Sequence, residues 1–281
     1  GRELTFGKLK PASKKRKILI IGGGPAGMKA ATVAASRGHT VKLIEASSKL
    51  GGQVNLAQRL PGRSEFGGIT TNLANKLHKQ NVEIKFKTNA SIEFVIQEAP
   101  EVVILATGGT SFEPKIEGKE NAHVVTARQI LEGKANVGSR VAIADWRCDW
   151  VGLGLAELLA RQGCHVRLAC NGMVPGQTIN QYVRDNWLGT LHKLNVETFT
   201  HLRLRGIDSE DAFFQHTLSG EPVILDDVDT LVTAFGAESA NTLEAELKNK
   251  FQSGLYVIGD ALSPRTVEEA IFDGLKTSTL I

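Results

Sequence analysis

A glycine-rich turn between a strand pattern and a helix pattern constrains this chain more than any other feature. The short apolar run KILII, rich in β-branched isoleucine, leads into GGGPAG and then into an alanine-rich stretch with helical spacing. Gly22, Gly24 and Gly27 give the spacing GxGxxG. The first permits a tight turn, the second lets a pyrophosphate approach the backbone, and the third lets the helix pack close to the strand. Because amides at a helix start favour phosphate groups, the turn predicts a dinucleotide-binding βαβ unit.

A carboxylate stands where such a unit needs one. The strand pattern VKLIE ends at Glu45, and an acid after the second strand can accept hydrogen bonds from an adenosine ribose. GxGxxG alone is a weak signal, because many glycine turns have only a structural role. With strand, helix and Glu45 in order, nucleotide binding is the favoured interpretation and a structural turn the weaker one.

Two later segments favour FAD as the nucleotide. Gly52 and Gln53 follow Glu45 closely, where a loop has to fold back over the pyrophosphate with its backbone exposed. In an ordinary loop the same glycine would need no explanation. The buried strand pattern EVVILAT ends at Thr107 and Gly108, small residues that leave space beside the adenosine.

A second acid near the end of the chain strengthens the case for FAD. Gly259 and Asp260 end the strand pattern LYVIGDA, and a carboxylate there can receive the ribitol hydroxyls. The segment from Thr266 has the T-x-x-E form of a capping box, which predicts a helix from Val267. The positive end of that helix would face the flavin N1–C2=O edge, where charge collects on reduction. A plain turn or cap role for Asp260 is the weaker alternative.

A second strand–turn–helix unit in the middle of the chain lacks this glycine spacing. After the strand pattern RVAIA the chain reads DWRCDWVGLG, which puts tryptophans and aspartates where a pyrophosphate needs bare backbone. Gly152 and Gly154 come late, inside the helix, and are expected to serve close packing. The next strand ends at Cys170, with neither a carboxylate for a ribose nor an arginine for a 2′-phosphate. Asp145 could still reach a ribose, so NAD(P)H binding remains the weaker alternative, and the tryptophans are expected to pack or form an interface.

Strand and helix patterns alternate along the chain, which is typical of parallel, doubly wound sheets. We predict an α/β fold of two nested Rossmann-like domains, the two-dinucleotide-binding architecture of glutathione reductase. Residues 1–16 are expected to form a linker. A discontinuous FAD- or ADP-binding domain is expected at 17–120 plus 237–281, and an NAD(P)-binding-like domain with a degenerate glycine motif at 121–236. At 281 residues, 42% of them hydrophobic, the chain can bury two cores.

Composition argues against several other classes of function. The net charge is only +3, and the one basic run, at 14–17, leads straight into a strand, so nucleic-acid binding is not expected. No apolar run suits a membrane helix and no secretory signal precedes the first strand, so we expect a cytoplasmic protein that does not bind membranes. A chain that starts at Gly1 is expected to be a processed or excised piece.

The residues that could bind a metal or act in catalysis form no cluster in the sequence. The three cysteines show no CxxC pair and no metal-ligand spacing, so we expect free buried thiols rather than a thioredoxin-reductase-type dithiol or a cluster held by this chain alone. The seven histidines are scattered, so no metal site is expected. No catalytic residue is nominated, because no nucleophile lies beside a base.

Four segments together carry a family resemblance: IIGGGPAGMKAA, LGGQVNLAQRLPG, VVILATGG and YVIGDALSPRTVEEAIFDG. They resemble the C-terminal nucleotide-binding half of old-yellow-enzyme-related iron–sulfur flavoproteins. This group includes trimethylamine and dimethylamine dehydrogenases, N-demethylases of methylated amino acids and 2,4-dienoyl-CoA reductase. The resemblance covers nearly the whole chain, and the opening GREL is similar to the segment just beyond the last cluster cysteine. The middle motif DWRCDWVGLGLAELLARQG is closer to the amine-oxidising branch.

The resemblance implies cofactors and partners outside this chain. An FMN-bearing TIM barrel and a four-iron cluster (4Fe–4S) are expected in a preceding part of the polypeptide or in a partner subunit, so an oligomer or complex is expected. Within the chain, the expected cofactor is FAD, or ADP as in trimethylamine dehydrogenase, with NAD(P)H as a further candidate. The residues expected to bind the nucleotide are Gly22, Gly24, Pro25, Ala26, Gly27, Glu45, Ala46, Gly52, Gln53, Thr107, Gly108, Gly259, Asp260, Thr266 and Val267.

Three functions follow. The leading one is an FAD-binding electron-transfer module that links an FMN–cluster unit to NAD(P)H or to an electron-transferring flavoprotein. The second is a redox-silent scaffold that holds ADP and braces the barrel or docks a partner. The third is a self-contained NAD(P)H:flavin reductase. In each case the cofactor would carry the chemistry, and the protein would supply position and electrostatics.

Overall fold

The computed structural model of the protein describes the backbone from residue 3 and the side chains from residue 5, in both cases through residue 281. The chain forms two compact units. The first comprises the residues up to Gln58 together with Glu65–Thr110 and Ala237–Ile281, and the second comprises Arg59–Ser64 and Ser111–Gly236. The second unit is thus inserted into the first, and two parallel sheets confirm the predicted nested α/β fold.

The first unit is built on a parallel five-stranded sheet with the order β15-β4-β1-β2-β3. Its strands are β1 (Lys17–Ile21), β2 (Thr40–Ile44), β3 (Glu83–Lys85), β4 (Val102–Leu105) and β15 (Leu255–Val257). Parallel pairing buries both faces of such a sheet, which explains why β4 and, after Lys17, β1 are apolar at consecutive positions rather than at alternate ones. In β1, Ile18 and Ile20 enter one core cluster, and Leu19 and Ile21 enter the other.

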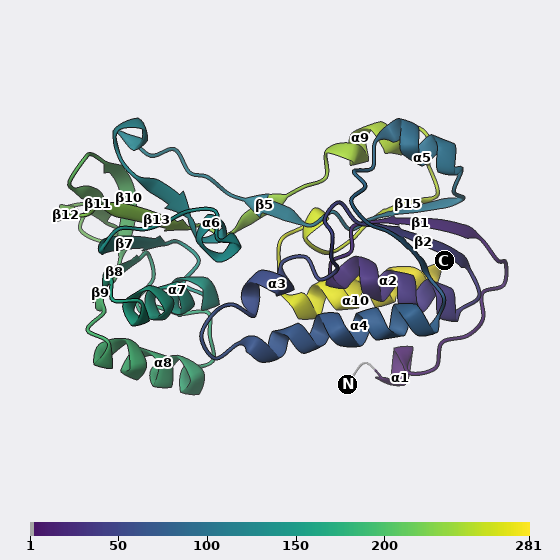
Figure 1. The fold of residues 1–281 in the computed structure, drawn as a ribbon, viewed down its shortest axis with the longest axis horizontal. Coiled ribbons are helices and arrows are strands. Elements are labelled where there is room, and N and C mark those ends of the chain that lie inside the picture. The colour runs from purple at the N-terminus through teal and green to yellow at the C-terminus, as the bar shows by residue number, and fades with distance from the viewer. Residues whose placement is uncertain (1–2) are drawn as a thin grey trace. The chain divides into compact units, whose positions relative to one another are not determined.

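Helices cover both faces of this sheet (Figure 1). On one face lie α2 (Pro25–Ser36), α4 (Gly67–Lys79) and α10 (Val267–Leu280); on the other lie α5 (Ile92–Glu98) and α9 (Thr242–Lys248). Short elements complete the unit: α3 (Val54–Ala57) and two 3-10 turns, η1 (Ser64–Phe66), where the chain re-enters this unit, and η3 (Gly259–Ala261). The strand β5 (Gly109–Ser111) pairs with β14 (Ala237–Ser239) where the chain leaves the unit and returns.

The second unit has its own parallel sheet, with the order β6-β13-β7-β8-β9. Its strands are β6 (Val124–Thr126), β7 (Arg140–Asp145), β8 (His165–Cys170), β9 (Glu197–Phe199) and β13 (Thr230–Ala234). The helices are α6 (Ala127–Glu132), α7 (Trp150–Arg161) and α8 (Gln181–Lys193), with a 3-10 turn η2 (Lys119–Asn121).

The other face of this second sheet differs from the expected helix layer. It is covered by an antiparallel sheet of β10 (Leu202–Ile207), β11 (Ala212–His216) and β12 (Pro222–Leu225), whose Phe214 packs in one cluster with Ala142 and Ala144 of β7. Small alanines on β7 leave room for that aromatic ring, so one sheet can stack on the other.

Three boundaries differ from those expected. The segment Arg59–Ser64, expected in the nucleotide-binding domain, belongs to the second unit. The segment after Ser111 belongs to the second unit, not the first as far as residue 120, because Glu117 pairs with β10 through the hydrogen bond from Ile207 N to Glu117 O, at 2.9 Å. The expected linker 1–16 contains a short helix, α1 (Glu3–Phe6), and Phe6 packs edge-on against Phe272 of α10 at 5.6 Å. Gly1 and Arg2 lie outside the described residues.

Candidate nucleotide-binding site

The turn after β1 can be made only with glycine at two of its positions. Gly22 has φ +112°, and a Cβ there would overlap the carbonyl oxygen of Ala106 at the end of β4. A Cβ at Gly27 would overlap the carbonyl oxygen of Gly22, so helix α2 can reach the turn only because Gly27 has no side chain. These contacts give Gly22 and Gly27 the tight-turn and close-packing roles predicted for them.

The start of α2 is left open. A Cβ at Gly24 would meet no atom of the described residues within 4 Å. Gly24 is also the N-cap of α2, and no described side chain caps the helix; Pro25 begins it, and its first turn has no acidic residue. No side-chain cap and no acidic residue of the first turn offsets the partial positive charge of this helix start, an arrangement that favours phosphate.

Glu45 is held against this turn by two backbone amides. Its Oε2 accepts a hydrogen bond from Gly23 N at 2.8 Å, and its Oε1 accepts one from Ser47 N at 2.7 Å. A Cβ at Gly23 would lie 2.8 Å from Oε2 of Glu45 and 2.6 Å from Cδ2 of Leu50. Gly23 was not among the residues predicted from the sequence, although the unbroken run GGG was the available signal. The two amides fix the carboxylate and leave its remaining lone pairs open to further donors.

The loop after β2 folds back over the glycine turn. Gly51 N donates to Gly23 O at 2.9 Å, and a Cβ at Gly52, where φ is +51°, would lie 3.2 Å from the Cα of Gly24. The next residue, Gln53, donates from Nε2 to Oδ2 of Asp260 at 2.8 Å, although 207 residues separate the two. The sequence therefore identified both sides of this contact but not the contact itself.

Asp260 lies in η3 with both carboxylate oxygens engaged. Oδ1 accepts from Arg265 N at 3.1 Å, and Oδ2 accepts from Gln53. Burial raises the pKa of Asp260, opposed by these hydrogen bonds. The preceding Gly259 has φ +61°, and a Cβ there would lie 2.8 Å from the Cβ of Ala26 in α2. This close approach brings the end of β15 beside the start of α2.

The start of α10 is capped, in contrast to that of α2. Thr266 forms the predicted capping box: its Oγ1 accepts from Glu269 N at 3.5 Å, and Oε2 of Glu269 accepts from Thr266 N at 3.0 Å. Thr107 is also engaged by the chain, since its hydroxyl donates to the carbonyl oxygen of Ala240. Thr266 and Thr107 therefore hold the scaffold in place, while Gly108, with φ +79°, meets no described atom within 4 Å of a built Cβ.

The corresponding turn of the second unit, after β7, is filled by side chains. Asp149 caps α7 by accepting from Val151 N at 2.9 Å. Asp145 is only 1% exposed; its Oδ1 accepts from Cys148 N at 2.9 Å, and its Oδ2 has no hydrogen-bond partner among the described residues. A Cβ at Gly152 would overlap that Oδ2, so Gly152 makes room for the carboxyl group.

Burial, with the nearby charges of Asp149 and Cys148, raises the pKa of Asp145 well above its usual value near 3.8. The other glycine of this turn, Gly154, faces Leu60, whose Cδ2 would lie 2.9 Å from a built Cβ. Gly152 and Gly154 therefore serve close packing, as predicted.

Both tryptophans of this turn also pack within the second unit. Trp146 stacks on Phe235 with centroids 5.9 Å apart and planes at 12°, while its amide donates to Ala234 O at 3.2 Å. Trp150 lies under the guanidinium of Arg63 at 3.8 Å and against Trp187 at 5.6 Å. Trp146 follows β7 directly and Phe235 follows β13 directly, so their stack lies just beyond the carboxyl ends of these two strands.

A model of the pyridine nucleotide-disulphide oxidoreductase family matches residues 16–274. The chain belongs to this family. It is 29% identical over 300 residues to N,N-dimethylglycine/sarcosine dehydrogenase of Chromohalobacter salexigens, covering 93% of this chain and 43% of that protein. To a probable N-methylproline demethylase of Rhizobium meliloti it is 31% identical over 311 residues, covering 98% and 45%.

Among solved structures, a 2-naphthoyl-CoA reductase complexed with 2-naphthoyl-CoA matches with a TM-score of 0.90 and 31% identity, covering 99% of this chain and 41% of that one. The chain thus spans less than half the length of these relatives. The predicted resemblance and the two-dinucleotide-binding architecture are confirmed, and the chain is an FAD/NAD(P)-binding oxidoreductase domain of this family.

The family's two nucleotides fit the two units unequally. In the first unit the open, uncapped start of α2 and the anchored carboxylate of Glu45 fit the diphosphate and ribose of an adenine dinucleotide. In the second unit the carboxyl groups of Asp145 and Asp149 occupy the start of α7, so a nicotinamide dinucleotide does not fit there in the same way.

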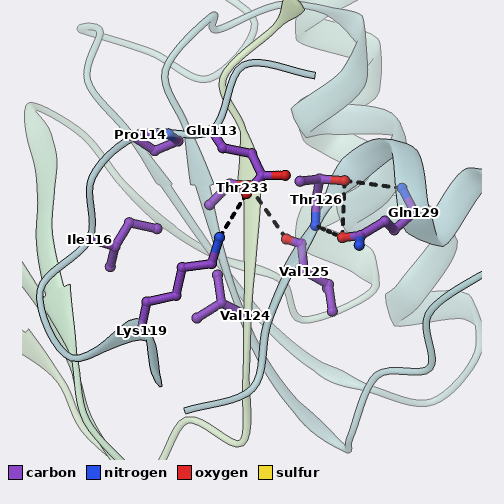
Figure 2. Close-up of a pocket in the computed structure, with 9 residues that line it drawn as sticks. All are labelled: Glu113, Pro114, Ile116, Lys119, Val124, Val125, Thr126, Gln129 and Thr233. Atoms are coloured by element: carbon purple, nitrogen blue, oxygen red, sulfur yellow. Dashed lines mark hydrogen bonds and ion pairs between the residues drawn. The ribbon is translucent and has the colours of Figure 1, made fainter. Parts of the chain in front are cut away.

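Other kinds of site are less developed. In the part of the chain that the structure describes, no three His, Cys, Asp or Glu side chains cluster to hold a metal ion, and no helix is long and apolar enough to span a membrane. A cavity of about 210 Å³ lies in the second unit (Figure 2). It is bounded by the ion pair between Lys119 and Glu113, at 2.7 Å, and by the capping box of Thr126 and Gln129. None of the predicted nucleotide-binding residues lines it.

Proposed function

We propose that the first unit binds FAD with its diphosphate at the start of α2, and that the chain works as an electron-transfer module. The observation that carries this proposal is the uncapped N-terminus of α2, which faces open space at Gly24. A helix start without a cap leaves backbone amides without partners, and an anionic ligand satisfies them better than solvent does.

The residues around that helix start have distinct roles in the proposal. Gly22 and Gly27 bring strand and helix together, and the α2 amides receive the phosphates. Glu45, fixed by two amides, accepts the ribose hydroxyls, and Gly52 covers the diphosphate from the other side. When bound, the isoalloxazine ring of FAD supplies one- and two-electron chemistry that protein side chains do not. In this arrangement no side chain of the chain acts as an acid or base on an organic substrate.

The remainder of the catalytic machinery is proposed to lie outside this chain. Its relatives are more than twice as long, and two of them are named for amine or amino-acid oxidation or demethylation. We therefore propose an FMN- and 4Fe–4S-containing barrel domain or subunit as the electron donor. An electron-transferring flavoprotein is the favoured acceptor over NAD(P)H, because the turn after β7 is closed by Asp145 and Asp149.

One observation favours ADP as an alternative occupant of the same site. Both carboxylate oxygens of Asp260 already accept hydrogen bonds, from Gln53 and from Arg265 N, so the residue expected to hold the ribitol is satisfied by the chain itself. ADP needs no ribitol contact, and with ADP the chain would be a redox-silent scaffold. FAD requires Gln53 to turn away from Asp260 or to share it.

The deciding experiment is to denature the purified protein and identify the released nucleotide by mass. FAD, with a flavin absorbance band in the native protein, is the expected result. Release of ADP without that band would replace the electron-transfer role with the scaffold role, and release of neither would contradict nucleotide binding. Rapid mixing with NADH and with NADPH then tests the acceptor: the flavin band should persist, and fast bleaching would instead support a self-contained NAD(P)H:flavin reductase.

A further inference from the structure

Two cysteines that are far apart in the sequence meet at the carboxyl edge of the second sheet. Strands β7 and β8 run in parallel with Asp145 opposite Cys170. The chain then turns sharply: Cys148 N donates to Oδ1 of Asp145 at 2.9 Å, and Cys148 itself has φ +50°. This turn brings Cys148 back over the end of β7, beside Cys170 at the end of β8.

The two sulfur atoms share one small, buried space. Sγ of Cys170 lies 3.7 Å from the carbonyl oxygen of Gly172, and a Cβ at Gly172 would lie 3.0 Å from Sγ of Cys148. Each thiol is the largest influence on the pKa of the other, and Sγ of Cys148 also lies 3.1 Å from Oδ1 of Asn171. Both residues are buried. Because no third ligand completes a metal set among the described residues, the contact is a pair of thiols.

The pair is chemically asymmetric. The hydrogen bond with Cys170 lowers the pKa of the Cys148 thiol to about 7, whereas the same hydrogen bond, with burial, raises the pKa of Cys170. At neutral pH one sulfur is thus available as a thiolate while its neighbour stays protonated. An attacking thiolate with a protonated thiol in contact is the combination that reacts with peroxides and then resolves to a disulfide.

We propose that Cys148 and Cys170 form a reversible disulfide when the protein meets a hydroperoxide. The thiolate of Cys148 attacks the terminal peroxide oxygen, which breaks the O–O bond, releases an alcohol or water and leaves a sulfenic acid on Cys148. The sulfur of Cys170 then displaces the hydroxyl, which leaves as water with the thiol proton, and the S–S bond forms. The peroxide gains two electrons and the thiol pair loses them. A dithiol reductant returns both thiols by exchange.

The disulfide would close a loop that contains the whole of α7, because that helix lies between the two cysteines in the sequence. It would fix the turn 146–149, which closes the helix start, onto strand β8. This redox step is independent of nucleotide binding in the first unit, so it can succeed or fail whatever the nucleotide experiment shows.

The test is a peptide map of the intact protein, and the chain offers a matched internal control. Trypsin separates the cysteines into the peptides 148–161, 162–167 and 168–184, because arginines stand at 147, 161, 167 and 184. Purified protein is treated with hydrogen peroxide, quenched with N-ethylmaleimide under denaturing conditions and digested. The expected product is peptide 148–161 linked to peptide 168–184, about 2 Da lighter than the sum of the two reduced peptides and separated by dithiothreitol.

Cys164 controls for general reactivity, since it is half-buried and its thiol lies beside the carbonyl oxygen of Gly138 rather than another thiol. The variant Cys164→Ser should keep the cross-link in full, and Cys148→Ser and Cys170→Ser should each abolish it. The proposal is overturned if peroxide leaves both cysteines free for N-ethylmaleimide, if it converts Cys148 to a sulfinic acid without a cross-link, or if Cys164 is linked as readily as Cys170.

Discussion

The turn after β1 and the turn after β7 stand at equivalent places in two parallel sheets, yet they treat the start of the next helix in opposite ways. At α2 the N-cap is Gly24, with no side chain and open space before it. At α7 the N-cap is Asp149, and a second carboxyl, that of Asp145, is buried against the helix. The start of α2 thus has no side-chain cap, whereas the start of α7 is capped by a carboxylate of the chain itself. The same fold can therefore leave a helix start open or close it with carboxyl groups, depending on a few side chains.

The largest effect is expected from giving α2 an N-cap carboxylate like the one that Asp149 provides for α7. Gly24→Asp puts an N-cap carboxylate at the start of α2, where the extended backbone of Gly24 suits a capping aspartate. ADP affinity should fall about 100-fold, or ~2.7 kcal/mol, because two anions compete for one helix start. Calorimetric titration with ADP measures the loss.

The matched control is Gly24→Asn, which caps the helix with nearly the same size and no charge. It should lose clearly less affinity than Gly24→Asp, and neither variant should lower the thermal unfolding midpoint, because both supply a helix cap. Equal losses in the two variants would mean that bulk rather than charge excludes the phosphate.

A pH-dependent effect is expected from Asp145. Below about pH 3.8, the usual pKa of an aspartate, the carboxyl is protonated in both folded and unfolded chains. Above it the unfolded chain releases the proton while the buried carboxyl retains it, so the unfolding free energy falls as the pH rises toward the raised folded pKa.

The variant Asp145→Asn cannot ionise, so it should lose this slope. Denaturant unfolding at several pH values, followed by the fluorescence of Trp146, Trp150 and Trp187, reports on the second unit, which holds all three tryptophans of this chain. Parallel slopes in the variant and the parent protein would show that Asp145 ionises normally in the folded state.

Gly152→Ala should destabilise the second unit by about 2 kcal/mol, because its Cβ would overlap Oδ2 of Asp145. Removing the obstacle should rescue it: the double variant Gly152→Ala with Asp145→Ala is expected to be less destabilised than the sum of the two single changes. Chemical unfolding of the four proteins gives the coupling directly. Additive losses would mean that the glycine is needed for some other reason.

The smallest effect concerns the cap itself. Asp149→Ala should cost about 1 kcal/mol of stability through loss of the hydrogen bond from Val151 N. It should not create NADH or NADPH binding, because the carboxyl group of Asp145 still lies against the start of α7 at Gly152. Fluorescence titration with each coenzyme tests this, and saturable binding would show that Asp149 alone closed the site.

The sequence predicted those features that depend on residues close together in the chain. The glycine spacing, Glu45 at the end of its strand, the capping box at Thr266 and the missing glycines after β7 all lie within a few residues of the structure they produce. The family resemblance added the expected cofactors and the missing partner domain.

The sequence did not predict contacts between distant segments. The bond of Gln53 to Asp260, the meeting of Cys148 with Cys170 and the antiparallel sheet behind β7 each depend on how strands are ordered in space. The absence of a CxxC pair excluded only a local dithiol. Two thiols at the ends of adjacent parallel strands can meet however long the helix between those strands is.

The paired strands β5 and β14 have a consequence for how this architecture can change. The inserted unit departs and returns through hydrogen-bonded neighbours, with Phe112 N donating to Gly236 O at 3.1 Å just beyond them. Because the two ends of the segment 111–236 meet at this strand pair, the length of that segment can change without separating β4 and β15, the paired strands of the first sheet that precede and follow it. A change in the second unit can therefore leave the strand order of the first sheet intact.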